Sequence, residues 1–266
     1  MDVRWVVDNF NSWAELVRVL AKLHSVDYKK IGLEKYGKDS GYYKRQAKSL
    51  VKVHDMQAKS IDHRTGVPVG PMPRFYEVSD YLANAYCPDE ACIVHGDYKM
   101  DNVMFHKTEP RIIGILDWEL STIGNPRADL INMTQLFRHS TKPAEVDERP
   151  LNVILKEAEE NYITKINDFR YEGIQSQQEL VELYCKLTNR AYPLSGFEYA
   201  SVFGLFRNSI IYHGIAARYA NGQATSTYAK QVAVFAPGTI LLAATIMDRA
   251  KKSEQNVVDS KLQSKL

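Results

Sequence analysis

Residues 93–129, IVHGDYKMDNVMFHKTEPRIIGILDWELSTIGNPRAD, decide what the rest of the chain can be. Three short apolar runs in and just before this stretch are too short for helices and are bounded by polar or turn-forming residues, which is typical of short buried strands. They occupy residues 91–94, 103–105 and 112–116. A strand delivers the polar residues that follow it to a loop. The first strand therefore leads to His95 and Asp97, and the third leads to Asp117.

The polar residues of this stretch follow in an informative order. Asn102 comes five residues after Asp97, and Asp117 ends the third strand. A phosphoryl-transfer site needs one Asp that orients the accepting hydroxyl and takes its proton. It also needs an Asn and a second Asp that hold Mg²⁺ on the nucleotide phosphates, and hard oxygen ligands suit that ion. We therefore expect Asp97 to be catalytic and Asn102 and Asp117 to bind the metal.

These residues resemble the aminoglycoside phosphotransferase and choline-kinase-like family, whose fold is protein-kinase-like. HGDYKMDNVMFH matches the family's H-G-D-x-x-x-x-N catalytic loop, and ILDWE matches its I-D-W-E strand end. The stretches LAKLHSVD, GYYKRQ and LDWELSTIGNPRADL also look like the kinase-like domain that precedes acyl-CoA dehydrogenase modules. The resemblance covers residues 12–250, roughly, and its central motif is specific because three polar positions agree in type, order and spacing.

The resemblance implies an α+β, mainly helical chain that forms the large, C-terminal lobe of a kinase-like phosphotransferase. A complete relative also has an N-terminal small lobe with a glycine-rich loop and a strand lysine that pairs with the phosphates. Here a helical pattern already begins at residue 12, so we expect the small lobe to be absent or truncated, with residues 1–11 as its remnant. Residues 12–250 would form the large lobe, and residues 251–266 a flexible polar tail.

The resemblance also assigns roles to four further residues. His95 is expected to prop the catalytic loop through hydrogen bonds, and Asp129 to anchor that loop from the following helix. Lys99 would either contact the transferred phosphate or face solvent. Glu119 would either lie close to the metal ligands or be a carboxylate that the start of a helix stabilises.

The function that follows is an ATP- and Mg-dependent small-molecule kinase acting on a hydroxyl group. The link to dehydrogenase modules favours a hydroxylated acyl compound as acceptor, held against helices within residues 150–250. The alternative is a catalytically impaired pseudokinase or binding module, because ATP without a small lobe loses part of its clamp. A third possibility is that the small lobe is encoded on another chain or exon. Expected partners are a small lobe or an acyl-CoA dehydrogenase.

Helical periodicity predicts eight helices, at residues 12–25, 40–58, 73–86, 129–138, 150–168, 176–189, 195–221 and 225–250. Residues 232–247 lack charge, but they are too few and too broken by Pro237 for a membrane span, so we expect a buried helix hairpin or a kinked core helix. Asn132 begins a glycosylation pattern, Asn-Met-Thr, which we discount because a buried helix should follow Asp129.

Charge, cysteines and the C-terminus bear on the partners and the location of the protein. The formal charge of +2 gives no reason to expect nucleic acid or an anionic membrane surface as a partner. Three cysteines without paired spacing argue against a disulfide framework or a zinc site. The final tripeptide, Ser264-Lys265-Leu266, is a peroxisomal address that an import receptor reads. Residues 260–262 repeat the same tripeptide, so local compositional bias is the competing explanation, and the location would then be cytoplasmic.

Overall fold

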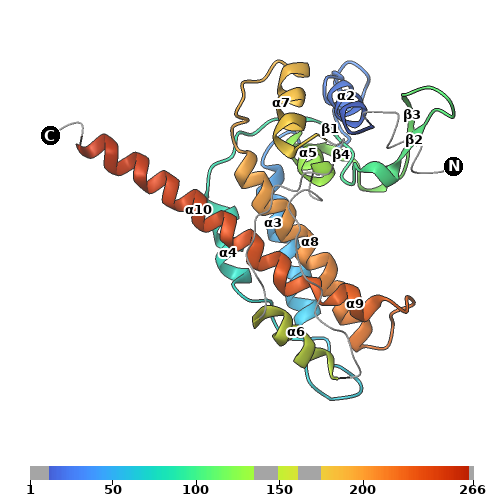
Figure 1. Cartoon of the computed structure of the whole chain (residues 1–266), viewed down its shortest axis with the longest axis vertical. Helices are drawn as coiled ribbons and strands as arrows, with labels where there is room; N and C mark the ends of the chain where they lie inside the picture. Colours follow the sequence, from blue (N-terminus) through green and yellow to red (C-terminus); the bar gives the residue numbers. More distant parts are fainter. Residues whose placement is uncertain (1–11, 135–148, 161–174, 264–266) are drawn as a thin grey trace. The chain divides into compact units, whose positions relative to one another are not determined.

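A computed structural model of the chain describes residues 12–134, 149–160 and 175–263, with the backbone alone for residues 254 and 256–263. The chain divides into two compact units, and each unit is assembled from three separate segments. The first unit takes residues 1–42, 87–139 and 166–200, and the second takes residues 43–86, 140–165 and 201–266. Figure 1 colours the elements of both units along the sequence.

The first unit combines helices with two small antiparallel sheets. Its helices are α2 (Ser12–His24), α5 (Arg127–Thr134) and α7 (Gln177–Leu187), with two short 3₁₀ helices at Met100–Asn102 and Trp118–Leu120. Strand β1 (Cys92–Val94) pairs with β4 (Thr122–Gly124), and β2 (Val103–Phe105) pairs with β3 (Ile112–Ile115). The sheets are short because polar loops interrupt the apolar runs after three or four residues.

The core of the first unit is built on the apolar face of α2. Leu16, Val17 and Leu20 recur at helical spacing and are fully buried, so one face of α2 packs against its neighbours α7 and β1. Tyr98, which follows Asp97 in the chain, is also fully buried, and its hydroxyl donates to the Leu16 carbonyl at 3.0 Å. The loop after β1 is therefore tied directly to the core.

The second unit is helical. It contains most of α3 (Tyr42–Ala58) and α8 (Phe197–Ala220), together with α4 (Phe75–Asn84), α6 (Leu151–Glu160), α9 (Ala229–Ala233) and α10 (Phe235–Gln263). Helix α10 packs against α4 and α6. The Arg74 guanidinium at the start of α4 forms a bidentate pair with the Asp248 carboxylate of α10, at 2.8 and 3.0 Å. Planar two-bond pairs of this kind fix orientation as well as adding attraction.

The predicted mainly helical α+β fold is confirmed, and the expected elements are present with small differences in their ends. Strand β4 was not predicted. The expected ends of two helices, at residues 138 and 168, lie outside the described residues. Helix α10 continues to Gln263, through the stretch expected to be a flexible tail. No glycine or proline interrupts residues 251–263, so a helix already nucleated in the core can propagate through them.

The helical segment that contains residues 232–247 breaks at Val234, and Pro237 lies in the first turn of α10. Proline is tolerated there because the first N–H groups of a helix have no partner within it. Residues 229–253 form one segment that is apolar and long enough to cross a membrane, but 67% of its most apolar window is buried inside the protein. That burial accounts for its composition as a core helix.

Candidate functional site

The β2–β3 hairpin brings two of the expected site residues together. Val103 lies opposite Ile115, so Asn102 just before β2 and Asp117 just after β3 are at the same end of the hairpin. The Leu116 N–H extends this pairing by donating to the Asn102 carbonyl at 2.9 Å. Positions fifteen residues apart in the chain therefore meet because the strands between them pair.

His95 joins this end of the hairpin to the loop that carries Asp97. The ring is fully buried, and its Nε2 lies 2.8 Å from the Leu116 carbonyl oxygen. Its Nδ1 accepts the Asp97 N–H at 3.2 Å, so Nε2 must carry the proton that bonds to Leu116. Both ring nitrogens are occupied by the backbone, an arrangement that suits a propping role better than proton transfer.

The Asp97 carboxylate is held at both oxygens. Oδ2 accepts from the Lys99 ammonium at 2.8 Å and from the Asn102 amide at 3.0 Å. Oδ1 accepts from the Asn132 amide at 3.2 Å. Burial alone would raise the pKa of Asp97, but the Lys99 contact and the two amides outweigh it and lower that pKa below its ordinary value. The carboxylate is therefore ionised at neutral pH and able to accept a hydroxyl proton.

The two remaining candidates lie nearer to solvent. The Lys99 side chain is 41% exposed, yet its ammonium contacts the Asp97 carboxylate, so it belongs to the site rather than to the solvent-facing surface alone. Glu119 is exposed within the three-residue 3₁₀ helix that follows Asp117. So short a helix has little dipole to stabilise a carboxylate.

Asp129 is the anchor of the loop. Its fully buried carboxylate accepts the backbone N–H groups of His95 and Gly96 at 2.7 and 2.8 Å. The His24 Nε2 lies 3.3 Å from the same carboxylate, and the His24 Nδ1 is 2.7 Å from the Tyr184 hydroxyl. A buried chain of contacts thus runs from α7 through α2 to the carboxylate on α5 and on to the loop after β1.

The sequence did not point to three residues of this network, which are His24, Tyr184 and Asn132. His24 and Tyr184 are 160 positions apart, and no local pattern relates them. Asn132 had a usable signal, because it lies three residues after Asp129 in the same helix and residues at that spacing share a face. Its amide bonds to the Asp97 carboxylate, an internal role that agrees with discounting the glycosylation pattern.

The donor set fits Mg²⁺ on a nucleotide. The Asn102 NH₂ group bonds to the backbone oxygen and to Oδ2 of Asp97, so the amide oxygen points the other way. Asp117 adds an exposed carboxylate on a left-handed backbone with φ of 65°. Mg²⁺ usually takes one or two protein oxygens and completes its shell with phosphates and water. Within the described residues, no group of three or more His, Cys, Asp and Glu side chains could hold a metal, so a closed all-protein site is not found there.

An exposed apolar surface lies close in the chain to the two metal-ligand candidates. Its five side chains come from the β2–β3 hairpin and the segment after it, and each is between 39% and 55% exposed: Met104, Ile113, Leu116, Trp118 and Leu120. Single exposed apolar residues are ordinary, but a cluster beside a polar site is typical of a surface that contacts a ligand or a partner.

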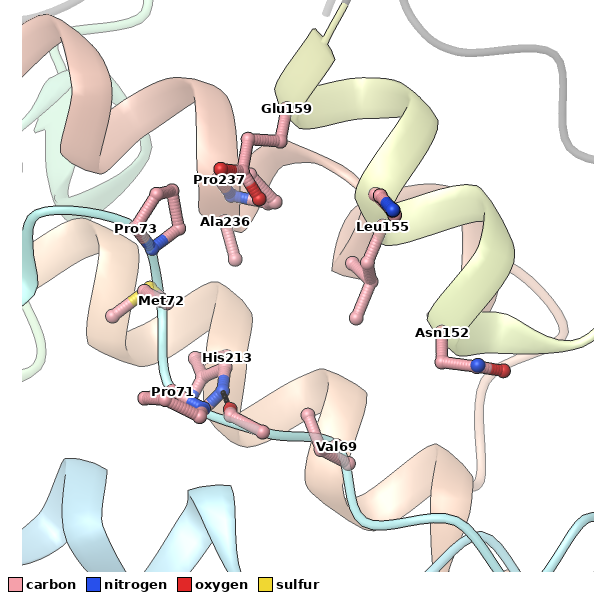
Figure 2. A pocket seen from close by; sticks show the side chains of 12 residues that line it. Val69, Pro71, Met72, Pro73, Asn152, Leu155, Glu159, His213, Ala236 and Pro237 are labelled. Atoms are coloured by element: carbon pink, nitrogen blue, oxygen red, sulfur yellow. Dashed lines mark hydrogen bonds between the residues drawn. The ribbon is translucent and has the colours of Figure 1, made fainter.

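The second unit contains a cavity of about 230 Å³, shown in Figure 2. Its walls are mostly apolar and come from the loop before α4 and from α6, α8 and α10: Val69, Pro71, Met72, Leu155, Ala236 and Pro237. His213 closes one side, where its Nε2 is 2.9 Å from the Gly70 carbonyl oxygen. Burial lowers the pKa of His213 to about 4, with His54 adding to the effect, so the ring is neutral. The other polar side chains that line the cavity, among them Glu159, come from α6.

Residues 7–152 match the model of the phosphotransferase enzyme family, APH. The chain belongs to this family. The matched region contains the candidate site residues from His95 to Asn132, whereas Tyr184 lies outside it.

Curated relatives of this chain are named as dehydrogenases. The chain is 32% identical over 212 residues to acyl-CoA dehydrogenase family member 11 of Gallus gallus, an alignment that covers 79% of this chain and 24% of that protein. The protein of the same name in Rattus norvegicus is 32% identical over 217 residues, covering 80% and 24%. The chain thus spans about a quarter of the length of these relatives.

A solved structure from Ralstonia eutropha, described as "a putative aminoglycoside phosphotransferase", has the same fold with a TM-score of 0.69 and 27% sequence identity. The match covers 90% of this chain and 65% of that one. The chain is therefore similar to an aminoglycoside phosphotransferase fold over nearly its whole length, but spans just under two thirds of the other protein.

Proposed function

We propose that this chain carries the catalytic residues of a small-molecule kinase that transfers the γ-phosphate of ATP to a hydroxyl group. Membership of the phosphotransferase family supports phosphoryl transfer in general. The finer assignment rests on one observation: the hydrogen bonds of His95 and the β2–β3 pairing bring Asp97, Asn102 and Asp117 to one end of one hairpin.

Asp97 would act on the acceptor. Its lowered pKa keeps the carboxylate ionised, so it can orient the attacking hydroxyl and take its proton as the new O–P bond forms and ADP leaves. Lys99, beside the same carboxylate, would stay close to the charge that develops on the transferred group. Because the transition state is loose, this positioning and charge stabilisation would supply most of the catalysis.

Asn102 and Asp117 would hold Mg²⁺, which on binding neutralises charge on the nucleotide phosphates. The support is the chemistry of the pair, an amide oxygen turned away from Asp97 and an exposed carboxylate at the same end of a hairpin. His95 and Asp129 would keep the loop in register with this pair. Glu119, two residues after Asp117, would contact the metal ligands and not the metal itself.

The acceptor we propose is a hydroxylated acyl compound. The relatives with the same domain are named as acyl-CoA dehydrogenases, which associates the domain with acyl compounds.

We also propose that the exposed apolar surface from Met104 to Leu120 receives a small lobe or another domain, with an acyl-CoA dehydrogenase as the named candidate. The presence of the domain within longer relatives supports this partner. The C-terminal tripeptide, which lies outside the described residues, is proposed to direct the chain to peroxisomes.

Calorimetry with ATP tests the nucleotide site. We expect binding that requires Mg²⁺, because Asn102 and Asp117 are the proposed metal ligands. Asp117→Ala should abolish the Mg²⁺-dependent part, whereas Asp101→Ala, which removes an exposed carboxylate from the same loop, should not. Binding that survives Asp117→Ala unchanged contradicts the metal assignment.

Phosphate transfer is then measured with a panel of hydroxylated acyl compounds, with an aminoglycoside as a comparison. Asp97→Asn should lower the rate by about 10²–10⁴-fold, the usual contribution of a positioned general base, and leave ATP binding intact. Nucleotide binding without transfer to any acceptor, both alone and with a small-lobe partner added, would favour the binding-module alternative.

A further inference from the structure

Helix α5 presents two polar side chains to the catalytic loop, one turn apart. Asp129 accepts the N–H groups of His95 and Gly96, and three residues later Asn132 donates to the next two residues of the loop. The Asn132 Nδ2 lies 3.2 Å from Oδ1 of Asp97 and 3.2 Å from the Tyr98 carbonyl oxygen. The two side chains together thus hold four consecutive loop residues, and both hydrogens of the Asn132 amide are used on the last two of them.

We propose that Asn132 is a positioning residue that fixes the plane of the Asp97 carboxylate for attack by the acceptor hydroxyl. The inference rests on the proposed function, because it assumes that Asp97 is the base. Asn132 lies outside the H-G-D and I-D-W-E segments, on helix α5.

The Asp97 side chain does not fix the plane of its own carboxylate, because the last torsion of an Asp side chain is broad and roughly two-fold. Lys99 and Asn102 both bind Oδ2, and rotation about that oxygen would move Oδ1. A donor on Oδ1 opposes this rotation. Asn132 is half-buried, and its second hydrogen on the Tyr98 carbonyl fixes the amide itself.

The choice of a neutral donor also matters. Lys99 already places a positive charge 2.8 Å from the carboxylate. A second cation at position 132 would hold the carboxylate more tightly and make it a much weaker base, whereas an amide directs the oxygen and lowers its basicity less. A carboxylate at position 132 would repel Asp97 and raise its pKa.

Orientation has a measurable consequence for rate. A misplacement of about 1 Å at a reacting centre can cost on the order of 10²-fold in rate. We expect Asn132→Ala to lower kcat of transfer roughly 10–100-fold, with the Kd for ATP and Mg²⁺ unchanged because Asn102 and Asp117 are untouched. Loss of the donor also raises the pKa of Asp97, so the acid limb of kcat/KM should move to higher pH.

Three further variants make the test specific. Asn132→Asp keeps the shape but replaces the donor with a like charge, so it should move the acid limb further than Asn132→Ala. Asn132→Gln keeps an amide and should recover part of the rate. Asn84→Ala removes an exposed amide that bonds to the Asp80 carbonyl in α4, and it should change neither rate nor pH profile.

The carboxyl ¹³C chemical shift of Asp97 at one neutral pH gives a readout that needs no activity. It is compared in the wild-type chain, Asn132→Ala and Asn132→Asp, with thermal unfolding used to confirm that each variant is folded. A wild-type chain without transfer activity contradicts the proposed function, whereas an unchanged Asp97 shift in a folded variant contradicts the contact with Asn132. A kcat within twofold of wild type would overturn the role of Asn132.

Discussion

Replacing Asp129 with Asn should destabilise the first unit by about 2–4 kcal/mol. The carboxylate is fully buried and accepts the N–H groups of His95 and Gly96. An Asn side chain has one acceptor oxygen and one NH₂ group, so one backbone N–H would face another donor. An orphaned buried donor costs about 1–3 kcal/mol, and the surviving bond loses the strength that the negative charge gave it.

One effect opposes this loss. A neutral amide avoids the cost of burying a charge, and removing a buried ion sometimes stabilises a protein. Here the donors decide the balance, because backbone N–H groups cannot move away from the site or change their hydrogen-bonding character. A typical domain has a free energy of unfolding of roughly 5–15 kcal/mol, so the expected loss is a large share of it.

Urea unfolding followed by tryptophan fluorescence measures this change, since the Trp118 ring lies 4.9 Å from the His95 ring that the network holds. Asp101→Asn is the matched control, because it makes the same chemical change at an exposed position and should stay within about 0.5 kcal/mol of wild type. A loss below about 0.5 kcal/mol for Asp129→Asn would refute the view that this carboxylate anchors the loop.

Gly96→Ala should unfold far more readily than Gly32→Ala: both have positive φ, but a Cβ at Gly96 would lie 2.5 Å from the Leu120 carbonyl oxygen, while nothing is within 4 Å at Gly32. Thermal melting should separate the two, and equal losses would argue against the contact. The His213 pKa of about 4 lies below the pKa of a histidine in the unfolded chain. The free energy of unfolding should therefore be highest above pH 6.5 and should fall by up to roughly 3 kcal/mol as the pH drops toward 4. Across that window, the urea midpoint of His213→Gln should fall less steeply with decreasing pH than the midpoint of the wild type. A fluorescent protein fused to the N-terminus should enter peroxisomes and become diffuse without the last three residues, whereas removal of residues 263–266 should restore import by exposing the internal Ser-Lys-Leu; diffuse fluorescence from the intact fusion would rule the address out.

The sequence predicted those parts of the site that are encoded locally. The β1, β2 and β3 strands appear as apolar runs, and the polar residues after them keep their order in any fold that pairs those strands. Helices were predictable for the same reason, because one periodic pattern of ten or more residues identifies a buried face. Both signals are contained within a window of the chain.

Strand β4 and the buried network were not predictable in this way. Thr122-Ile123-Gly124 is too short to show alternation, and it becomes a strand only because Cys92 and its neighbours lie opposite. Gly124 is needed where the Tyr42 ring lies 2.7 Å from the position of a Cβ. Such requirements come from long-range packing and leave no mark in the local pattern.

Burial divides the residues of the motif into two groups with different physical consequences. His95 and Asp129 are fully buried and bind backbone groups, so their loss exposes unsatisfied polar atoms and reduces stability. Asp97 keeps 23% of its side chain exposed and Asp117 is exposed, so water can replace their contacts and their loss should spare the fold. Asn102, at 8% exposure, belongs to both groups, because its amide nitrogen closes the loop on Asp97 while its oxygen stays directed away from it. A defect in transfer at Asn102 therefore indicates lost metal binding only when the loop is shown to be intact, whereas the same defect at Asp117 can be interpreted directly.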